Sequence, residues 1–293
     1  MIQIIDTHLH IWDLSRFTLP WLENAPLLKQ SYLLADYLSA MDQADTYQIV
    51  KAVYVEVDVT KEQKELENKY IIQLGHENTN IIAAASISAD LSKVDTKQYV
   101  DQYGKDAVVK GVRHVLHVSS SLPKACLSPV FIDNVRYLPK RNLLFEACMK
   151  TDELEDLHTL AKACPETTIV LNHMGSVDPH IISKKQPTQS EQAYKDKWQI
   201  NIANLSRLSN VVCKISGLNP SANWDHSTLE PSIEYCFEAF GEERIMFGSN
   251  YPVCNLSTGL DPWIQALIQI TRHKSKIFCE NLFYNNAARI YGL

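Results

Sequence analysis

The feature that most limits the fold of this 293-residue chain is the regular alternation of short apolar runs with amphipathic segments. Eight runs rich in β-branched and aliphatic residues recur along it: Ile2–Ile11, Val50–Val57, Ile81–Ser86, Val108–Leu116, Leu143–Met149, Thr168–Leu171, Val211–Ile215 and Arg244–Phe247. Runs of this length without a sustained polar alternation are typical of parallel strands that are covered on both faces. The pattern therefore predicts eight parallel strands.

Segments with the apolar spacing of an amphipathic helix lie between these runs. In Asp152–Ala163 the acidic residues fall in the first turn, where the helix dipole favours negative charge, and Leu154, Leu157 and Ala161 share one face. Similar patterns occupy Leu34–Met41, Lys61–Glu77, Val130–Leu138, Tyr194–Leu208, Pro231–Phe240, Pro262–Thr271 and Leu282–Ile290. Because no linker rich in Gly, Pro or Ser divides the pattern, it predicts an α/β fold with one domain over residues 1–293, a (β/α)8 TIM barrel.

The composition argues against several classes of function. The net charge is −6 and no block of Lys or Arg stands out, so we expect no nucleic-acid partner. The sequence begins without the basic and apolar regions of a signal peptide, and no stretch approaches the roughly 18 apolar residues of a membrane helix. Seven Cys without C-x-x-C spacing disfavour a disulfide framework and a structural zinc site. We therefore expect a cytoplasmic protein with no membrane partner, and the sequence is compatible with a homo-oligomer.

The longest irregular stretches each follow a predicted strand. They are Asp13–Ser31, Ser119–Pro129, Gly175–Ser190 and Leu218–Leu229. In a TIM barrel the loops after the strands form the catalytic face. We therefore expect the functional side chains at the carboxyl ends of the strands.

The first predicted strand carries a polar face. Because alternate residues of a strand face the same way, Asp6, His8 and His10 share one face, and Ile5 and Leu9 share the other. Two imidazoles that point into the barrel can serve as metal ligands or as proton carriers. The alternative is a pair of structural histidines near a surface loop. Asp6 on the same face favours the functional interpretation, because a buried carboxylate is costly.

Two further strand ends carry candidate catalytic residues. His173 ends the sixth run and is followed by Gly175, which suits a sharp turn out of a strand. Asn250 ends the eighth run. A lone histidine after a strand is more often structural, but its position at a strand end, like that of His10, favours a functional role. We expect these residues to meet at the mouth of the barrel.

Three other strands add polar groups that could bind a substrate. In the fourth run, parity places Arg113 with His117 and puts His114 on the opposite face. Glu146 lies in the fifth run and Lys214 in the seventh. A single buried charge of this kind can simply form an ion pair that fills the barrel. Several of them at strand ends fit a polar substrate site better.

Motifs along the whole chain carry a resemblance to one family. They are Asp6–Asp13, Lys110–His114, His173–Gly175, Trp198 with Asn204–Leu205, Cys213–Leu218, Arg244–Val253 and Asn286–Tyr291. With these motifs in this order, the sequence resembles the amidohydrolase-related metal-dependent hydrolases (amidohydrolase family 2). It is most similar to the branch that hydrolyses sugar lactones and dicarboxylate lactones.

The resemblance implies a set of catalytic residues and leaves the metal open. In the family a histidine pair on the first strand, a later histidine and an aspartate on the last strand surround the reacting carbonyl. His8, His10 and His173 match the histidines, but Asn250 stands where the family has aspartate. An amide cannot titrate near neutral pH and is a weaker metal ligand, so neither role of that aspartate transfers directly. The alternatives are one zinc-like divalent ion held by the three histidines, or no metal.

The activity implied by the resemblance is hydrolysis of a small polar lactone, most simply that of a sugar acid. Arg113 and His114 are candidates for binding the substrate or stabilising the oxyanion, and His173 or Glu146 is better suited than Asn250 to act as the base. Trp12 and Tyr251 are candidates for apolar walls against a sugar ring. Two alternatives are a metal-dependent amidohydrolase or decarboxylase acting on a small carboxylate, and a non-catalytic barrel that binds a sugar acid.

Overall fold

The computed structural model describes residues 1–41, 45–77, 81–116, 122–218, 224–257 and 259–293. Eight parallel strands form one sheet in sequence order: β1 (Ile2–Leu9), β2 (Tyr47–Val55), β3 (Ile82–Ser88), β4 (Val109–Val115), β5 (Leu144–Cys148), β6 (Ile169–Leu171), β7 (Val211–Ile215) and β8 (Ile245–Phe247). Backbone bonds join the first strand to the last: the Asn250 N–H donates to the His8 carbonyl and the His10 N–H to the Tyr251 carbonyl, both at 2.8 Å. The predicted (β/α)8 barrel is confirmed.

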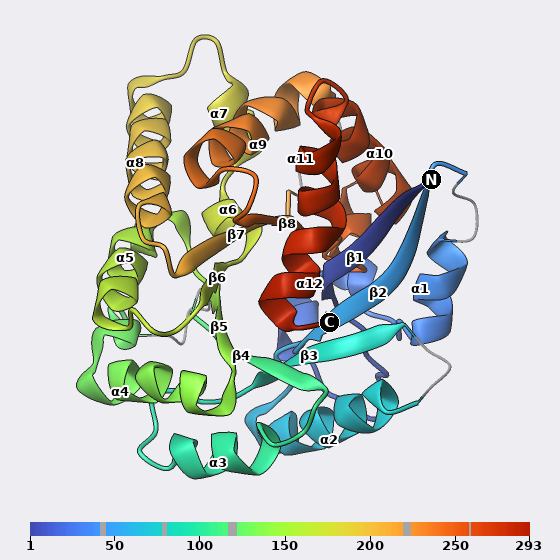
Figure 1. Ribbon diagram of the computed structural model, residues 1–293, viewed down its shortest axis with the longest axis vertical. Coiled ribbons are helices and arrows are strands. Elements are labelled where there is room, and N and C mark those ends of the chain that lie inside the picture. The colour runs from blue at the N-terminus through green and yellow to red at the C-terminus, as the bar shows by residue number, and fades with distance from the viewer. Residues whose placement is uncertain (42–44, 78–80, 117–121, 219–223, 258) are drawn as a thin grey trace.

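Helices surround the strands, as Figure 1 shows. They are α1 (Leu34–Met41), α2 (Lys64–Gly75), α3 (Thr96–Tyr103), α4 (Pro129–Tyr137), α5 (Leu154–Ala163), α6 (His173–Ser176), α7 (Pro179–Ser183), α8 (Gln189–Ser206), α9 (His226–Phe240), α10 (Leu260–Thr271), α11 (Lys276–Glu280) and α12 (Asn286–Tyr291). The helix α3 was not predicted, because it buries only Thr96, Val100 and Tyr103, too few residues to give a clear apolar stripe. The helix α7, five residues inside a predicted loop, was not predicted either.

Apolar side chains of the strands and of α12 fill the amino-terminal end of the barrel interior. One core cluster collects inward side chains from the strands, among them Ile5, Val53 and Met246, together with Ala287 and Tyr291 of α12. In Figure 1 this last helix lies across the middle of the ring of strands. The amino-terminal end is therefore closed by α12.

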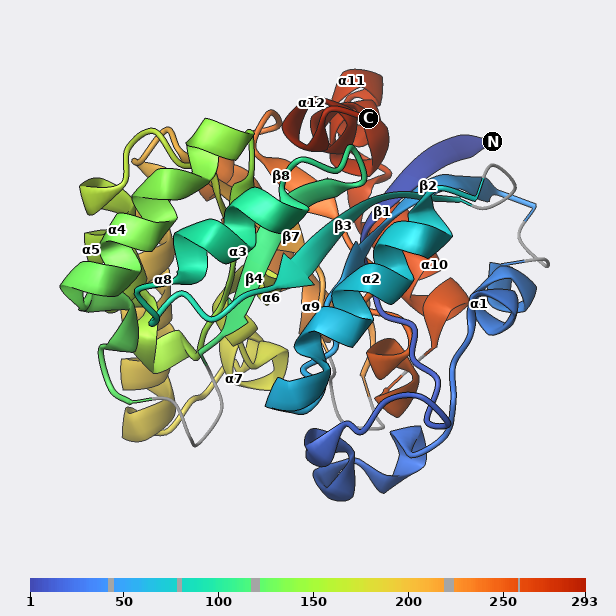
Figure 2. The same cartoon turned by 90° about the horizontal axis from the view of Figure 1, so that it is seen from below.

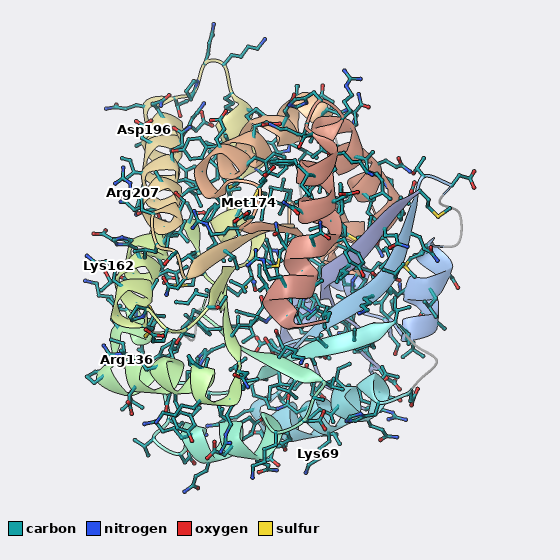
Figure 3. The ribbon with its side chains drawn as sticks, viewed as in Figure 1. Lys69, Arg136, Lys162, Met174, Asp196 and Arg207 are labelled. Carbon is teal, nitrogen blue, oxygen red and sulfur yellow. The ribbon has the colours of Figure 1, made fainter. Side chains whose placement is uncertain are left out.

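A larger core cluster lies between the strands and the helices. Met174 belongs to it and is fully buried, and Figure 3 shows this residue toward the inside of the molecule. The labelled charged residues, such as Lys162 and Asp196, lie at the periphery. Among the described residues no helix has the length and apolar character needed to cross a membrane.

The connections that follow the strands gather at the end opposite α12. Figure 2 shows α7 and the segment after β1 at one end of the barrel, and α11 and α12 at the other. This arrangement places the open mouth of the barrel where the strands end.

The polar face predicted for β1 needs one correction. Asp6 does not share a face with His8, because its carboxylate accepts from the Tyr37 hydroxyl of the outer helix α1 at 2.6 Å. Ile5 points instead into the barrel core. The pairing register of β1 with β2 shifts between Asp6 and Leu9, and such an irregularity reverses the alternation. Asp6 has a structural role, since it also accepts from the backbone N–H groups of His8 and Ser249.

Candidate active site

A cavity of about 710 Å³ opens at the carboxyl-terminal end of the barrel. Seven of the eight strands, all except β3, contribute a lining residue on the strand or within three residues after it. The polar residues of the lining include His10, Asp58, Arg113, His173, Asp178, His180 and Asn250. Four residues predicted from the sequence, His10, Arg113, His173 and Asn250, therefore meet in one cavity.

His10 lines this cavity, and His8 lies against His10, fully buried and outside the lining. Burial lowers the pKa of His8 well below its usual value, and burial with the nearby Arg113 charge lowers the pKa of His10 to about 3. Both rings are therefore neutral near pH 7. The His10 Nδ1 lies 2.7 Å from the Val55 carbonyl, which can only accept, so this nitrogen carries the hydrogen. The His10 Nε2 then accepts from the His8 Nε2 at 3.1 Å.

Lys214 and Glu146 form a buried ion pair next to His8. The Lys214 ammonium donates to the Glu146 carboxylate at 2.8 Å and lies 3.5 Å from the His8 Nδ1. Glu146 also accepts from the Asn172 amide at 2.6 Å and from the Tyr291 hydroxyl of α12. Burial lowers the pKa of Lys214, and the charge of Glu146 opposes this shift. Neither charged residue lines the cavity, so both support the site from within the barrel.

His173 is held at the cavity by the backbone that follows β6. Its φ of 56° lies in the left-handed region, and its Nδ1 is 2.9 Å from the Ser216 hydroxyl. Gly217 packs directly against the ring, because a Cβ at this position would lie 2.3 Å from two ring atoms of His173. The centroids of the His173 and His8 rings are 4.4 Å apart. The turns after β6 and β7 therefore fix this imidazole beside the histidine pair.

Arg113 reaches the cavity from β4 and is paired with Glu56, which follows β2. The Arg113 Nε donates to the Glu56 carboxylate at 2.6 Å, and a terminal nitrogen donates to the Glu56 carbonyl. The Glu56 charge raises the pKa of Arg113 above its usual value despite burial. The reciprocal charge of Arg113 lowers the pKa of Glu56, although burial opposes it. The guanidinium is therefore a fixed, permanently charged donor.

Asn250 closes the ring of cavity residues after β8. Its φ of 57° is left-handed, which asparagine tolerates better than most residues. Its buried position results from its N–H bond to His8 and from the bond of its carbonyl to the Cys254 N–H at 2.9 Å. The side chain lines the cavity. The position at which the resemblance implies an aspartate therefore lies at the cavity itself.

The structure places other predicted site residues elsewhere. His114 faces the helical layer, where its Nδ1 accepts from the Leu91 N–H at 3.0 Å and its ring contacts Phe131. Trp12 is buried, donates to the Gln30 carbonyl at 2.7 Å and does not line the cavity. Tyr251 is likewise outside the lining and packs against two other tyrosine rings. His117 lies outside the described residues.

Several polar or aromatic residues of the cavity were not predicted from the sequence, among them Trp21, Asp58, Asp178 and His180. Trp21 comes from the short helix Pro20–Asn24 inside the predicted loop after the first strand, and Asp178 and His180 come from the loop after the sixth strand. No pattern in the sequence distinguishes these loop positions. Asp58 could have been predicted, because together with Glu56 it places two acids at alternate positions at the end of the second predicted strand.

The described donors do not fit the divalent ion that the resemblance allows. A divalent ion held by histidines needs a lone pair from each imidazole, and these lone pairs must point to one common position. The lone pair of His10 Nε2 accepts from His8, and the Nδ1 of His8 faces the Lys214 ammonium. Asn250 supplies an amide in place of a carboxylate. Among the described residues no group of three His, Cys, Asp or Glu side chains is placed to hold a metal.

Sequence comparisons find relatives along the whole chain. The amidohydrolase family matches residues 5–293. The protein y4mH of Sinorhizobium fredii is 27% identical over 99% of this chain and 98% of its own. An L-fucono-1,5-lactonase of Burkholderia multivorans is 24% identical over 99% of this chain and 96% of its own. An L-rhamnono-gamma-lactonase of Scheffersomyces stipitis is 21% identical over 99% of both chains.

Solved structures share the same architecture. Amidohydrolase 2 from Bifidobacterium longum subsp. infantis has a TM-score of 0.75 and 26% identity over 100% of both chains. An amidohydrolase from Burkholderia multivorans with bound zinc has a TM-score of 0.84 and 22% identity over 99% of both chains. A probable 2-pyrone-4,6-dicarboxylic acid hydrolase from Acinetobacter baumannii, with citric acid bound, has a TM-score of 0.73 and 17% identity, again over 99% of both.

Proposed function

This chain belongs to the amidohydrolase family, and we propose from that premise that it hydrolyses the lactone of a small sugar acid. The family and its lactonase-named relatives make it a hydrolase acting on lactone esters. The observation that carries the finer proposal is the convergence of His10, Arg113, His173 and Asn250 in one cavity. The volume of about 710 Å³ is in the usual range for a small-molecule site.

His173 is the proposed general base. A serine hydroxyl can accept from an imidazole N–H, so the contact of Ser216 with Nδ1 supports the tautomer whose lone pair is on Nε2. Water attacks the carbonyl carbon of the lactone while this Nε2 takes its proton. The bond between the carbonyl carbon and the ring oxygen then breaks, and the proton passes from His173 to that oxygen. The product is the open hydroxy acid.

Arg113 and Asn250 are the proposed donors to the carbonyl oxygen. Glu56 orients the Arg113 guanidinium, which carries five N–H groups and can bind Glu56 and a ligand together. Donors that are already in place stabilise the negative charge of the tetrahedral intermediate without reorganising. The neutral His10 beside them adds no competing charge.

A screen of lactones tests the proposal. Purified protein is given a panel of aldonolactones, including the fuconic and rhamnonic lactones, and hydrolysis is followed by acid release. Calorimetry with the corresponding open acids runs in parallel. Turnover of at least one aldonolactone is expected. Binding of the open acids with no turnover of any lactone would instead identify a binding protein, and activity only on unrelated esters or amides would contradict the proposed substrate class.

The variant His173→Ala tests the assigned base. We expect turnover of the best lactone to fall about 10²–10⁴-fold, the range that general acid–base groups supply, with the melting temperature little changed. The matched control is His226→Ala, at an exposed histidine at the start of α9. A variant with normal specific activity that melts well below the wild type would make His173 a structural residue.

A further inference from the structure

Trp21 and Asp58 form one side of the active-site cavity, and the catalytic proposal uses neither of them. The indole Nε1 of Trp21 donates to the Val57 carbonyl at 2.8 Å, so the ring is tied to the loop that carries Asp58. The Trp21 ring also packs edge to face against Trp12, with centroids 5.6 Å apart. The segments that carry Trp21 and Asp58 are therefore tied together, and both residues line the cavity.

The backbone under Asp58 is held from two sides. The Asp58 N–H donates to the Glu56 carboxylate at 2.8 Å, and the Val57 N–H donates to the Glu67 carboxylate of α2 at 2.7 Å. The φ of Asp58 is 51°, a left-handed conformation that these two bonds support. The backbone that carries the Asp58 carboxylate is therefore held in place.

The charge of the cavity lining is not positive. Arg113 and Asp58 are each paired, Arg113 with Glu56 and Asp58 with the Lys64 ammonium 4.0 Å away, and Asp178 adds a further carboxylate. A ligand that carries carboxylates would face this lining with unfavourable electrostatics, whereas hydroxyl groups can donate to both aspartates.

We propose that Trp21 and Asp58 are the specificity wall of the enzyme and select a neutral, polyhydroxylated lactone ring over a lactone that bears carboxylates. This inference rests on the proposed lactonase function. The indole packs against the C–H face of the sugar ring, and the Asp58 carboxylate accepts hydrogen bonds from two neighbouring hydroxyls. The hydrolysis product carries a new carboxylate, and the same wall favours its release.

The test compares Asp58→Asn with the wild type on three substrates. They are the best aldonolactone, the hydroxyl-free δ-valerolactone and the carboxylate-bearing D-glucaro-1,4-lactone. Asp90→Asn is the matched control, because Asp90 follows β3 and lies outside the cavity lining. Loss of a hydrogen bond to a charged group corresponds to a change in KM of about 10–100-fold. We expect KM for the aldonolactone to rise by this factor with kcat within about threefold, KM for δ-valerolactone to stay constant, and KM for the glucarolactone to fall.

Two Trp21 variants test the aromatic half of the wall. Trp21→Phe keeps a ring and is expected to change KM for the aldonolactone by less than about threefold, whereas Trp21→Ala should raise it about tenfold or more, the scale of lost aromatic contact. Melting temperatures of all variants show whether the loop still folds. Equal effects of Asp58→Asn on all three substrates, or none on any, would overturn the proposal.

Binding of a non-hydrolysable sugar lactam by calorimetry separates this inference from the proposed function. One outcome is that the wild type binds the lactam, that Asp58→Asn weakens this binding, and that no lactone is cleaved. In that case the specificity wall is supported and the lactonase assignment fails. If the protein cleaves aldonolactones and neither KM nor lactam affinity responds to Asp58→Asn, the lactonase stands and the wall fails.

Discussion

At the scale of single residues, Asn250 occupies the position where the resemblance to the family implies an aspartate. It lines the cavity after β8, and its backbone N–H bonds to the His8 carbonyl. Asparagine has nearly the volume of aspartate but cannot accept a proton usefully. The reaction must therefore use another base, which we assign to His173. Asn250→Asp is expected to add a titrating group to the pH dependence of kcat/KM for the best lactone and to raise the affinity for divalent metal.

Metal content and the pH–rate profile of both forms check this prediction. A carboxylate at position 250 would add an anionic ligand beside His10 and His173, which the wild type lacks. Indistinguishable metal content and pH profiles would place residue 250 outside the reacting centre. Such a result would also remove the proposed donor role of the Asn250 amide.

At the scale of elements, the turn after β7 positions His173, the proposed general base. Gly217 has a φ of 66°, and an added Cβ would collide with the His173 ring. Gly217→Ala should lower kcat for the best lactone by at least tenfold, because the ring must move. The left-handed backbone adds a stability cost of about 1–2 kcal/mol.

Gly241→Ala is the matched control for this prediction. Gly241 also has a positive φ, of 68°, and a Cβ there meets nothing within 4 Å. Stability by chemical denaturation and kcat are measured for both variants. Equal loss of activity in the two would mean that Gly217 acts through stability alone and does not position His173.

The helix α2 contributes a buried carboxyl that makes stability depend on pH. Burial, with the nearby charge of Glu56, raises the pKa of Glu67 to about 8. A group whose pKa is raised in the folded state stabilises it below the unfolded pKa, near 4.3, and this contribution is lost as the pH rises through 8. We expect the free energy of unfolding to fall between about pH 4.3 and 8, and Glu67→Gln to remove that part of the slope.

Glutamine imitates the protonated side chain and can still accept from the Tyr54 hydroxyl and the Val57 N–H. Denaturant unfolding from pH 5 to 9 measures the slope. Glu65→Gln, on the exposed side of the same helix, is the control and should leave the slope unchanged. If the Glu67→Gln protein keeps the wild-type slope, the titrating group lies elsewhere.

At the scale of the whole molecule, one buried network connects the closed end of the barrel to the active site. Tyr291 of α12 donates to Glu146, which pairs with Lys214, which lies against His8. Removing one member of a buried ion pair leaves the other charge without a partner. Lys214→Met should therefore destabilise the fold by about 3–5 kcal/mol, and the double variant Lys214→Met with Glu146→Gln should recover most of that loss.

Equilibrium unfolding of the two single variants and the double variant measures the coupling. If the double variant loses the sum of the free energies of unfolding lost by the single variants, Lys214 and Glu146 contribute to stability independently. Lactone turnover of the double variant then tells whether the network also orients His8. A folded double variant with full activity would limit the network to stability.

The sequence by itself determined the barrel, because the fold depends on periodicity. Eight apolar runs and the segments between them are local patterns, and each strand falls within or close to its predicted range. The same order of motifs identified the family, which the match over residues 5–293 confirms. Parity along β4 also placed Arg113 and His114 on opposite faces as expected, because that strand has regular alternation where it pairs with β5.

Tertiary structure alone decided which of the polar residues face the cavity. The register shift in β1 turned Asp6 toward α1, since strand parity fails wherever the pairing slips by one residue. Lys214 and Glu146 were drawn together inside the barrel, because a buried charge needs a partner that only another strand can supply. Trp21 reached the cavity from the segment after β1, whose course has no periodicity to read. A sequence records the spacing of side chains along one element, and contacts between elements depend on distances that no local pattern contains.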